Sequence, residues 1–151
     1  LILADAISYL EDKYKPDYII DLATLTGACV VALGSFVSGL MSNDETFEKA
    51  IIRASENGFD EVWPLPMWEE YAELVKSKSA DLRNVTNLGE AGTITAACFI
   101  QSFVSKAKWA HVDIAGPAYR TRPIAPIDAG ATGAGVSLVV ETIKILEKEK
   151  V

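Results

Sequence analysis

The segment YIIDLATLTG, residues 18–27, joins a short apolar run to a turn of small and hydroxylated residues. The apolar run, residues 18–22, has the length of a buried strand. Apolar residues at helical spacing precede it over residues 1–14, and Lys15-Pro16-Asp17 separates the two elements. A helix, a break, a strand and a turn in this order are typical of a layered α/β fold.

The rest of the chain continues this alternation. Helices are predicted over residues 1–14, 28–33, 45–57, 68–75, 93–106 and 135–150. Strands are predicted over residues 18–22, 36–41 and 109–114, with extended chain over 62–66 and loops over 77–92 and 120–132. The first helix is expected to bury Leu3, Ala6, Ile7 and Leu10 and to expose Asp5, Glu11 and Asp12. No repeat or linker divides the chain, so residues 1–151 are predicted to form one unit.

The composition is that of a globular protein, with half of the 151 residues hydrophobic and a net charge of −7. An acidic surface disfavours binding to nucleic acid and to anionic membranes, and no apolar run has the length of a membrane span. The single histidine, His111, argues against a multi-histidine metal site. Cys29 and Cys98 lack CxxC spacing and are predicted to be buried, reduced packing residues of a cytoplasmic protein.

The turn over residues 23–27 is a candidate ligand-binding element. Its backbone groups follow a buried strand, and Gly27 would let a substrate main chain approach closely. In open α/β sheets, ligands bind at the carboxyl ends of the strands. The alternative is a plain strand-to-helix turn in which Thr26 caps the next helix, and the spacing alone favours that alternative.

The segment WAHVDIAG, residues 109–116, places His111 and Asp113 on one face of a strand, because they are two residues apart. They predict either a histidine–carboxylate pair for acid–base chemistry or a buried hydrogen bond that orients the strand. The second interpretation is favoured, because no nucleophile or metal partner lies nearby in the sequence.

The predicted loop over residues 77–92 carries the remaining candidate polar residues. Asp81, Arg83 and Asn84 are interpreted as structural or interface residues rather than substrate contacts. The Gly89-Glu90-Ala91-Gly92 stretch resembles an anion-binding loop before a helix, but it lacks the Lys-Ser/Thr of a P-loop. The residues alone therefore predict an α/β domain with ligand-facing turns and no complete catalytic set.

Several segments together resemble the leucyl aminopeptidase family, cytosolic two-metal enzymes that remove N-terminal residues from peptides. The matching segments keep the family's order and spacing, and they are residues 1–6, 21–28, 31–34, 93–97 and 109–116. Residues 44–75 and 119–133 match less well. The resemblance implies a layered α/β/α fold with a mixed, largely buried sheet. It also implies that residues 1–151 are the C-terminal portion of the catalytic domain, without an internal boundary.

The resemblance implies that this chain supplies pocket walls but not metal ligands. In the family, the segment matching residues 1–5 follows the signature Asn-Thr-Asp-Ala-Glu-Gly-Arg, which provides metal-binding carboxylates and the catalytic arginine. The catalytic residues are therefore expected just upstream of Leu1. We expect no catalytic residue and no metal ligand in this chain, no metal bound by it alone, and no activity of it alone. In the intact protein, two divalent ions, zinc or manganese, would activate water and polarise the scissile carbonyl.

Motif matching places the implied substrate contacts in the two turns. The backbone at Leu25 and Gly27 would hold the substrate main chain, Thr24 and Thr26 would shape the pocket floor, and Ala115 would line the side-chain subsite. The family also implies a peptide substrate, a homohexamer and a cytoplasmic location. The alternative function is a non-catalytic oligomerisation or scaffold module derived from the same fold. Because a partial sheet leaves a bare edge strand, the chain alone is further expected to be oligomeric or marginally stable.

Overall fold

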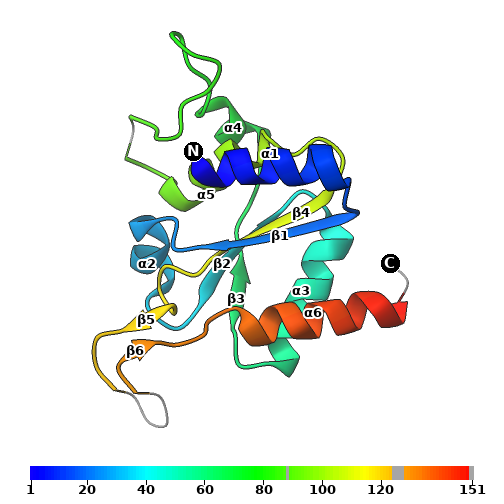
Figure 1. Cartoon of the computed structure of the whole chain (residues 1–151). Coiled ribbons are helices and arrows are strands. Elements are labelled where there is room, and N and C mark those ends of the chain that lie inside the picture. Colours follow the sequence, from blue (N-terminus) through cyan, green and yellow to red (C-terminus); the bar gives the residue numbers. More distant parts are fainter. Residues whose placement is uncertain (88, 124–127, 150–151) are drawn as a thin grey trace.

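A four-stranded mixed sheet lies between two layers of helices in the computed structural model, which describes residues 1–87, 89–123 and 128–149 (Figure 1). The strands are β1 (Tyr18–Ala23), β2 (Ser38–Ser42), β3 (Val62–Pro64) and β4 (Lys108–Asp113), in the order β1-β4-β2-β3. β1 pairs parallel with β4, β4 pairs antiparallel with β2, and β2 pairs parallel with β3. The predicted layered fold with a mixed sheet is confirmed.

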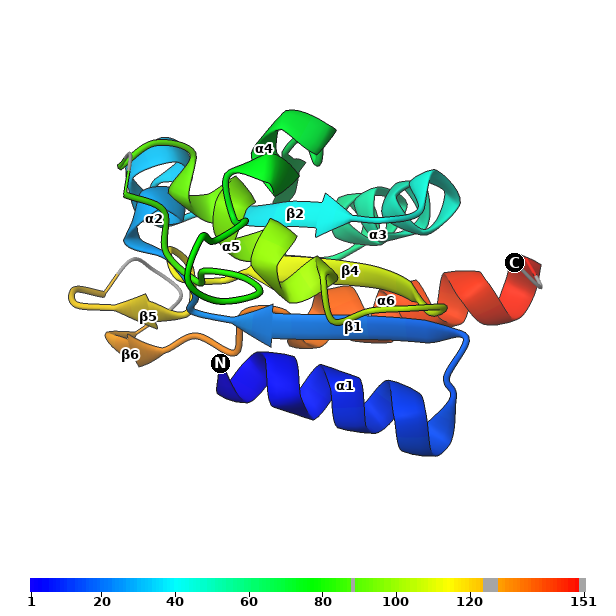
Figure 2. The same cartoon turned by 90° about the horizontal axis from the view of Figure 1, so that it is seen from above.

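Helices cover both faces of this sheet. α1 (Ile2–Tyr14), α4 (Glu69–Glu73) and α5 (Gly92–Gln101) lie on one face, and α3 (Glu45–Asn57) and α6 (Val136–Glu149) lie on the other (Figure 1). The short helix α2 (Gly27–Leu33) lies beyond the end of the sheet at which β1 finishes (Figure 2). That end of the sheet is therefore flanked by α2 and by loops.

Each face of the sheet has its own hydrophobic core. Buried Ile7, Phe99 and Trp109 belong to the core under α1 and α5, whereas buried Phe47 and Leu138 belong to the core under α3 and α6. Along β4 the side chains alternate, since Ala110 and Val112 pack into the second core and Trp109 into the first. His111 and Asp113 therefore share the face of Trp109, as their spacing predicts.

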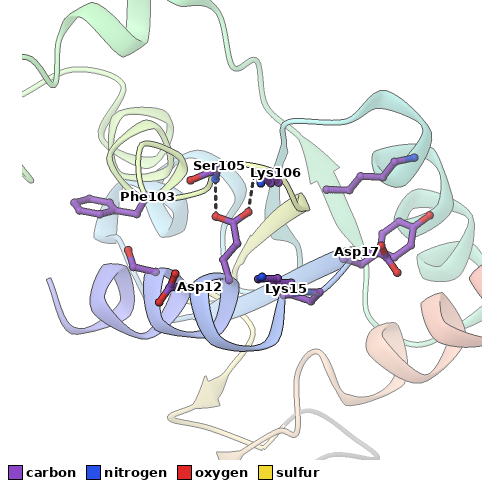
Figure 3. Close-up of a pocket in the computed structure, with 11 residues that line it drawn as sticks. Asp12, Lys15, Asp17, Phe103, Ser105 and Lys106 are labelled. Carbon is purple, nitrogen blue, oxygen red and sulfur yellow. Dashed lines mark hydrogen bonds between the residues drawn. The ribbon is translucent and has the colours of Figure 1, made fainter.

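The first helix buries only part of the predicted face, on which Leu3 packs against the core. Ala4 and Ile7 are buried, but Ala6 and Leu10 are exposed. Glu11, predicted to be exposed, is turned inward, and its carboxylate accepts three consecutive backbone N–H groups at 2.6–2.7 Å from residues 105–107. Figure 3 marks the two hydrogen bonds to Ser105 and Lys106. Such a row of N–H groups binds a carboxylate strongly, so this contact sets which side of α1 faces the protein.

The same contact explains why α5 is shorter than predicted. The helical pattern predicts a helix over residues 93–106, but α5 ends at Gln101. In a longer helix, the N–H groups of residues 105–107 would bind carbonyls four residues earlier. Here they bind Glu11 instead, and the chain turns directly into β4.

A small hairpin lies within the predicted loop over residues 120–132. β5 (Tyr119–Arg120) and β6 (Gly130–Ala131) pair antiparallel, which the proline-rich sequence concealed. Pro126 of that loop, Leu88 of the predicted loop over residues 77–92 and Lys150 at the end of the predicted last helix lie outside the described residues. In the described part of the chain, no helix combines the length and apolarity that a bilayer crossing requires.

Replacing Glu11 by glutamine should destabilise the chain at neutral pH by about 1 kcal/mol, because an amide offers one acceptor oxygen where the carboxylate offers two. Burial alone would raise the pKa of Glu11, but the N–H groups of Ala107, Lys106 and Ser105 outweigh it and lower the pKa below its ordinary 4.5. The stabilisation is therefore present above the ordinary pKa and is lost as the pH falls through the lowered one. Urea unfolding from pH 7 to pH 3 measures this difference.

The matched control is Asp12→Asn, the neighbouring and exposed acidic residue of α1. It removes one negative charge from the same helix and should leave the stability almost unchanged. If Glu11→Gln had the unfolding curve and the pH dependence of the unaltered chain, the contact would not hold α1 in place.

Candidate functional site

The ends of β1 and β4 form the candidate site. Their parallel register pairs Ala23 with Asp113, so both strands finish at the same edge of the sheet. The turn over residues 24–27 and the turn over residues 114–116 therefore lie next to each other. This is the edge at which ligands bind in open α/β sheets, as the sequence predicts.

One carboxylate joins the two turns. Asp113 is fully buried, and its Oδ1 accepts the Leu25 N–H at 3.2 Å and the Ala115 N–H at 3.1 Å. Its Oδ2 accepts the Thr26 hydroxyl at 2.7 Å. Three of the five predicted substrate-binding residues are thus held around a single side chain that sequence reasoning assigned to a histidine pair.

Thr26 also caps α2, as the spacing predicts. Its hydroxyl oxygen accepts the N–H of Cys29 at 3.0 Å and lies 3.0 Å from the hydroxyl oxygen of Thr93 on α5. Since the single hydroxyl proton of Thr26 goes to Asp113, Thr93 is the donor in the second contact. The turn is thereby connected to β4, α2 and α5 at once.

A cavity of about 380 Å³ adjoins this turn. Leu25 and Thr26 line it together with Ala96 and Phe99 of α5 and with Asn84 of the loop that precedes α5. Thr24 and Gly27 are exposed and Ala115 is half-buried, and none of the three lines this cavity. The sequence did not predict that α5 contributes a wall, because a helix dense in small residues also fits an ordinary core.

Leu1, the residue before which the catalytic signature is expected, also lines this cavity. Its side chain is exposed, and its carbonyl accepts the N–H of Asp5 at 3.0 Å at the start of α1. An apolar side chain cannot transfer a proton or bind a metal ion, so Leu1 has no catalytic role of its own and is at most part of the cavity wall. The expectation that catalytic residues lie just upstream of Leu1 concerns positions outside this chain and stays a prediction.

Two glycines lie near the site, and packing requires glycine at one of these positions but not at the other. A Cβ at Gly116 would lie 2.1 Å from the carbonyl oxygen of Gly34, so the exit from β4 can pass the end of α2 only without a side chain. A Cβ at Gly27 would meet nothing within 4 Å. The packing of the described residues therefore does not require glycine at position 27.

The predicted pairing of His111 with Asp113 is wrong. His111 Nδ1 lies 2.5 Å from Oδ1 of Asp21, its register partner on β1, and Oδ2 of Asp21 accepts the indole N–H of Trp109 at 2.7 Å. Residues two apart on a strand are about 7 Å apart, whereas paired strands are only about 4.8 Å apart, so the neighbouring strand supplies the closer partner. The favoured interpretation, a buried hydrogen bond that orients the strand, holds with this change of partner.

Both cysteines are buried and free, as predicted. Burial raises the pKa of both thiols, and at Cys29 the negative charge of Asp113 adds to the rise. Thiols of raised pKa are neutral at pH 7 and poor nucleophiles. Cys29 and Cys98 therefore act as small packing residues.

The described residues do not fit a metal centre. Across residues 1–87, 89–123 and 128–149, no three His, Cys, Asp or Glu side chains are grouped so as to hold an ion. Two buried carboxylates lie on β1 and β4, Asp113 at the candidate edge and Asp21 farther inside the sheet, and both already accept hydrogen bonds on both oxygens. Both are buried and hydrogen-bonded to protein groups, and no third ligand is grouped with them among the described residues.

We therefore expect the chain alone to bind neither zinc nor manganese tightly. Isothermal titration of the chain with each ion at pH 7 should give no saturable heat, and excess EDTA should leave its thermal unfolding unchanged. Saturable binding of two ions per chain would contradict the expectation and would point to a ligand set that this arrangement does not provide.

Comparison with known proteins gives consistent results. The family model described as "Cytosol aminopeptidase family, catalytic domain" matches residues 1–140. Probable cytosol aminopeptidases of Geobacter sulfurreducens and Chlorobaculum parvum are 54% and 52% identical over 146 and 145 residues, each covering 95% of this chain. The structure of a tomato leucine aminopeptidase mutant matches 93% of the chain with a TM-score of 0.85 and 40% identity. The chain spans only 28–29% of the two curated relatives and 27% of the tomato chain.

Proposed function

The chain belongs to the cytosol aminopeptidase family, and on this basis we propose that it is part of a metal-dependent aminopeptidase that removes N-terminal leucine and similar residues from peptides. The observation that carries the proposal is the match of residues 1–140 to the family's catalytic domain. We propose that residues 1–151 form the C-terminal portion of that domain, without an internal boundary. The two core clusters that share one sheet support a single unit.

We propose that the substrate lies against the two turns at the ends of β1 and β4. The Leu25 N–H is already bound to Asp113, so the carbonyl of Leu25 is the group proposed to hold the substrate main chain. Gly27 would let that main chain approach, and its exposure and the open space around it support this role. Thr24 and Thr26 would shape the floor, and Ala115, which is half-buried beside the same carboxylate, would line the side-chain subsite.

The metal chemistry is proposed to come from residues that precede Leu1 in the intact protein. Two divalent ions, zinc or manganese, would supply an activated water and polarise the scissile carbonyl. Because the described residues do not fit such ions, this chain's part is to bind and orient the peptide. The position of Leu1 at the cavity beside Leu25 supports this arrangement, since residues joined to Leu1 would enter next to the candidate turn.

A homohexamer and a cytoplasmic location complete the proposal. The relatives' name, probable cytosol aminopeptidase, supports that location.

Hydrolysis of leucine p-nitroanilide tests the proposal. Residues 1–151 would replace the matching segment of the Geobacter sulfurreducens relative, and the chimera and the isolated chain would be assayed side by side with manganese or zinc. The chimera should release p-nitroaniline, EDTA should abolish the release, and the isolated chain should be inactive. A folded chimera that does not hydrolyse the substrate would instead favour the scaffold function.

Replacing Gly27 by alanine in the chimera should raise KM for leucine p-nitroanilide roughly tenfold, because a methyl group would stand where the substrate main chain approaches. The same change in the isolated chain should leave the midpoint of thermal unfolding unchanged, since the new Cβ meets no protein atom within 4 Å. An unaltered KM would remove Gly27 from the substrate-binding surface.

A further inference from the structure

The hydrogen bonds around Asp113 indicate a role beyond filling the core. It is fully buried, and in the described part of the chain no lysine or arginine lies within salt-bridge distance of it. Burying an unpaired carboxylate is costly unless hydrogen bonds replace its water. All three of its hydrogen-bond donors within the described residues belong to the turns at the candidate site. The carboxylate therefore stabilises those turns in particular.

Asp21 shows what a buried carboxylate with a purely internal role looks like. It lies on the same face of the neighbouring strand and is 7% exposed. Its partners are side chains within the sheet layer, His111 and Trp109, and not the backbone of a turn. The two aspartates thus have similar burial and chemistry, but Asp113 binds the turns and Asp21 binds side chains within the sheet.

The geometry at Oδ1 of Asp113 sets the spacing between the turns. This one oxygen accepts both the Leu25 N–H and the Ala115 N–H, so the two nitrogens can be no farther apart than the sum of those two hydrogen-bond lengths. The peptide unit between Thr24 and Leu25 is planar and trans, so fixing the Leu25 N–H also fixes the opposite direction of the Thr24 carbonyl. Oδ2 adds Thr26, and through it Thr93 on α5.

We propose that Asp113 is the positioning residue of the substrate-binding surface. It holds the turn that binds the peptide main chain and the turn that lines the side-chain subsite at one fixed separation, so that an N-terminal residue can engage both at once. This inference rests on the proposed aminopeptidase function. Asp113 itself touches no substrate in this arrangement and acts through Leu25, Thr26 and Ala115.

Two substitutions at Asp113 remove its hydrogen bonds to different extents. Asp113→Asn keeps an oxygen for the Leu25 and Ala115 N–H groups but turns an NH2 group towards Thr26, whose proton must then go to Thr93. Asp113→Ala removes all three acceptor contacts. In the chimera, Asp113→Ala should raise KM for leucine p-nitroanilide by about 10- to 100-fold, and Asp113→Asn by less.

The matched control is Asp21→Asn, which removes the other buried carboxylate of the same sheet face. It should lower the midpoint of thermal unfolding but leave KM near that of the unaltered chimera. A merely structural role for Asp113 would reduce the active fraction, and hence the apparent kcat, without moving KM. An unchanged KM in a folded Asp113→Ala or Asp113→Asn chimera would overturn the proposal.

Backbone hydrogen exchange in the 151-residue chain gives a readout that needs no activity. Asp113→Ala, which removes the acceptor of both N–H groups, should speed exchange at the Leu25 and Ala115 amides while amides within β2 and β4 stay slow, and Asp21→Asn should not. Unchanged protection at both amides would also overturn the positioning role. An inactive unaltered chimera would overturn the proposed function and the substrate-binding part of this inference, whereas exchange would still decide whether Asp113 fixes the turns.

Discussion

The parallel pairing of β1 with β4 is the constraint on which the rest of the structure depends. It brings Asp21 opposite His111 and Ala23 opposite Asp113, and thereby places two turns that are far apart in the sequence at one sheet edge. Because a shift by one residue would turn every side chain to the opposite face, the register is tied to both cores. The buried register of the two strands therefore fixes the positions of the two turns that form the candidate site.

The two buried aspartates have different roles along this strand pair. Asp21 ties the strands together in the interior, and Asp113 ties their ends to the turns that follow. Glu11 does the same for α1, which it fastens to the chain just before β4. Glu11 and Asp113 each accept backbone N–H groups that secondary structure leaves unpaired, so polar contacts, and not packing alone, decide where loops meet the sheet.

Local patterns predicted what depends on local physics. The limits of α3 and the cap at Thr26 followed from spacing and capping chemistry, and the family resemblance supplied the layered mixed sheet. The partner of His111, the inward turn of Glu11 and the early end of α5 depend on residues about 90 or more positions away. No periodicity within a helix or strand contains that information. For the same reason, the sequence identified the turn residues of the candidate site but not the carboxylate that holds them.

The separation of β1 and β4 in the chain has a consequence during synthesis. Asp21 leaves the ribosome 90 residues before its partner His111, and at bacterial or eukaryotic elongation rates this delay is roughly 5–20 s. Throughout that time β1 lacks its hydrogen-bonding neighbour β4. β1 therefore waits for β4, and the turn after β1 takes its final shape only once Asp113 has emerged.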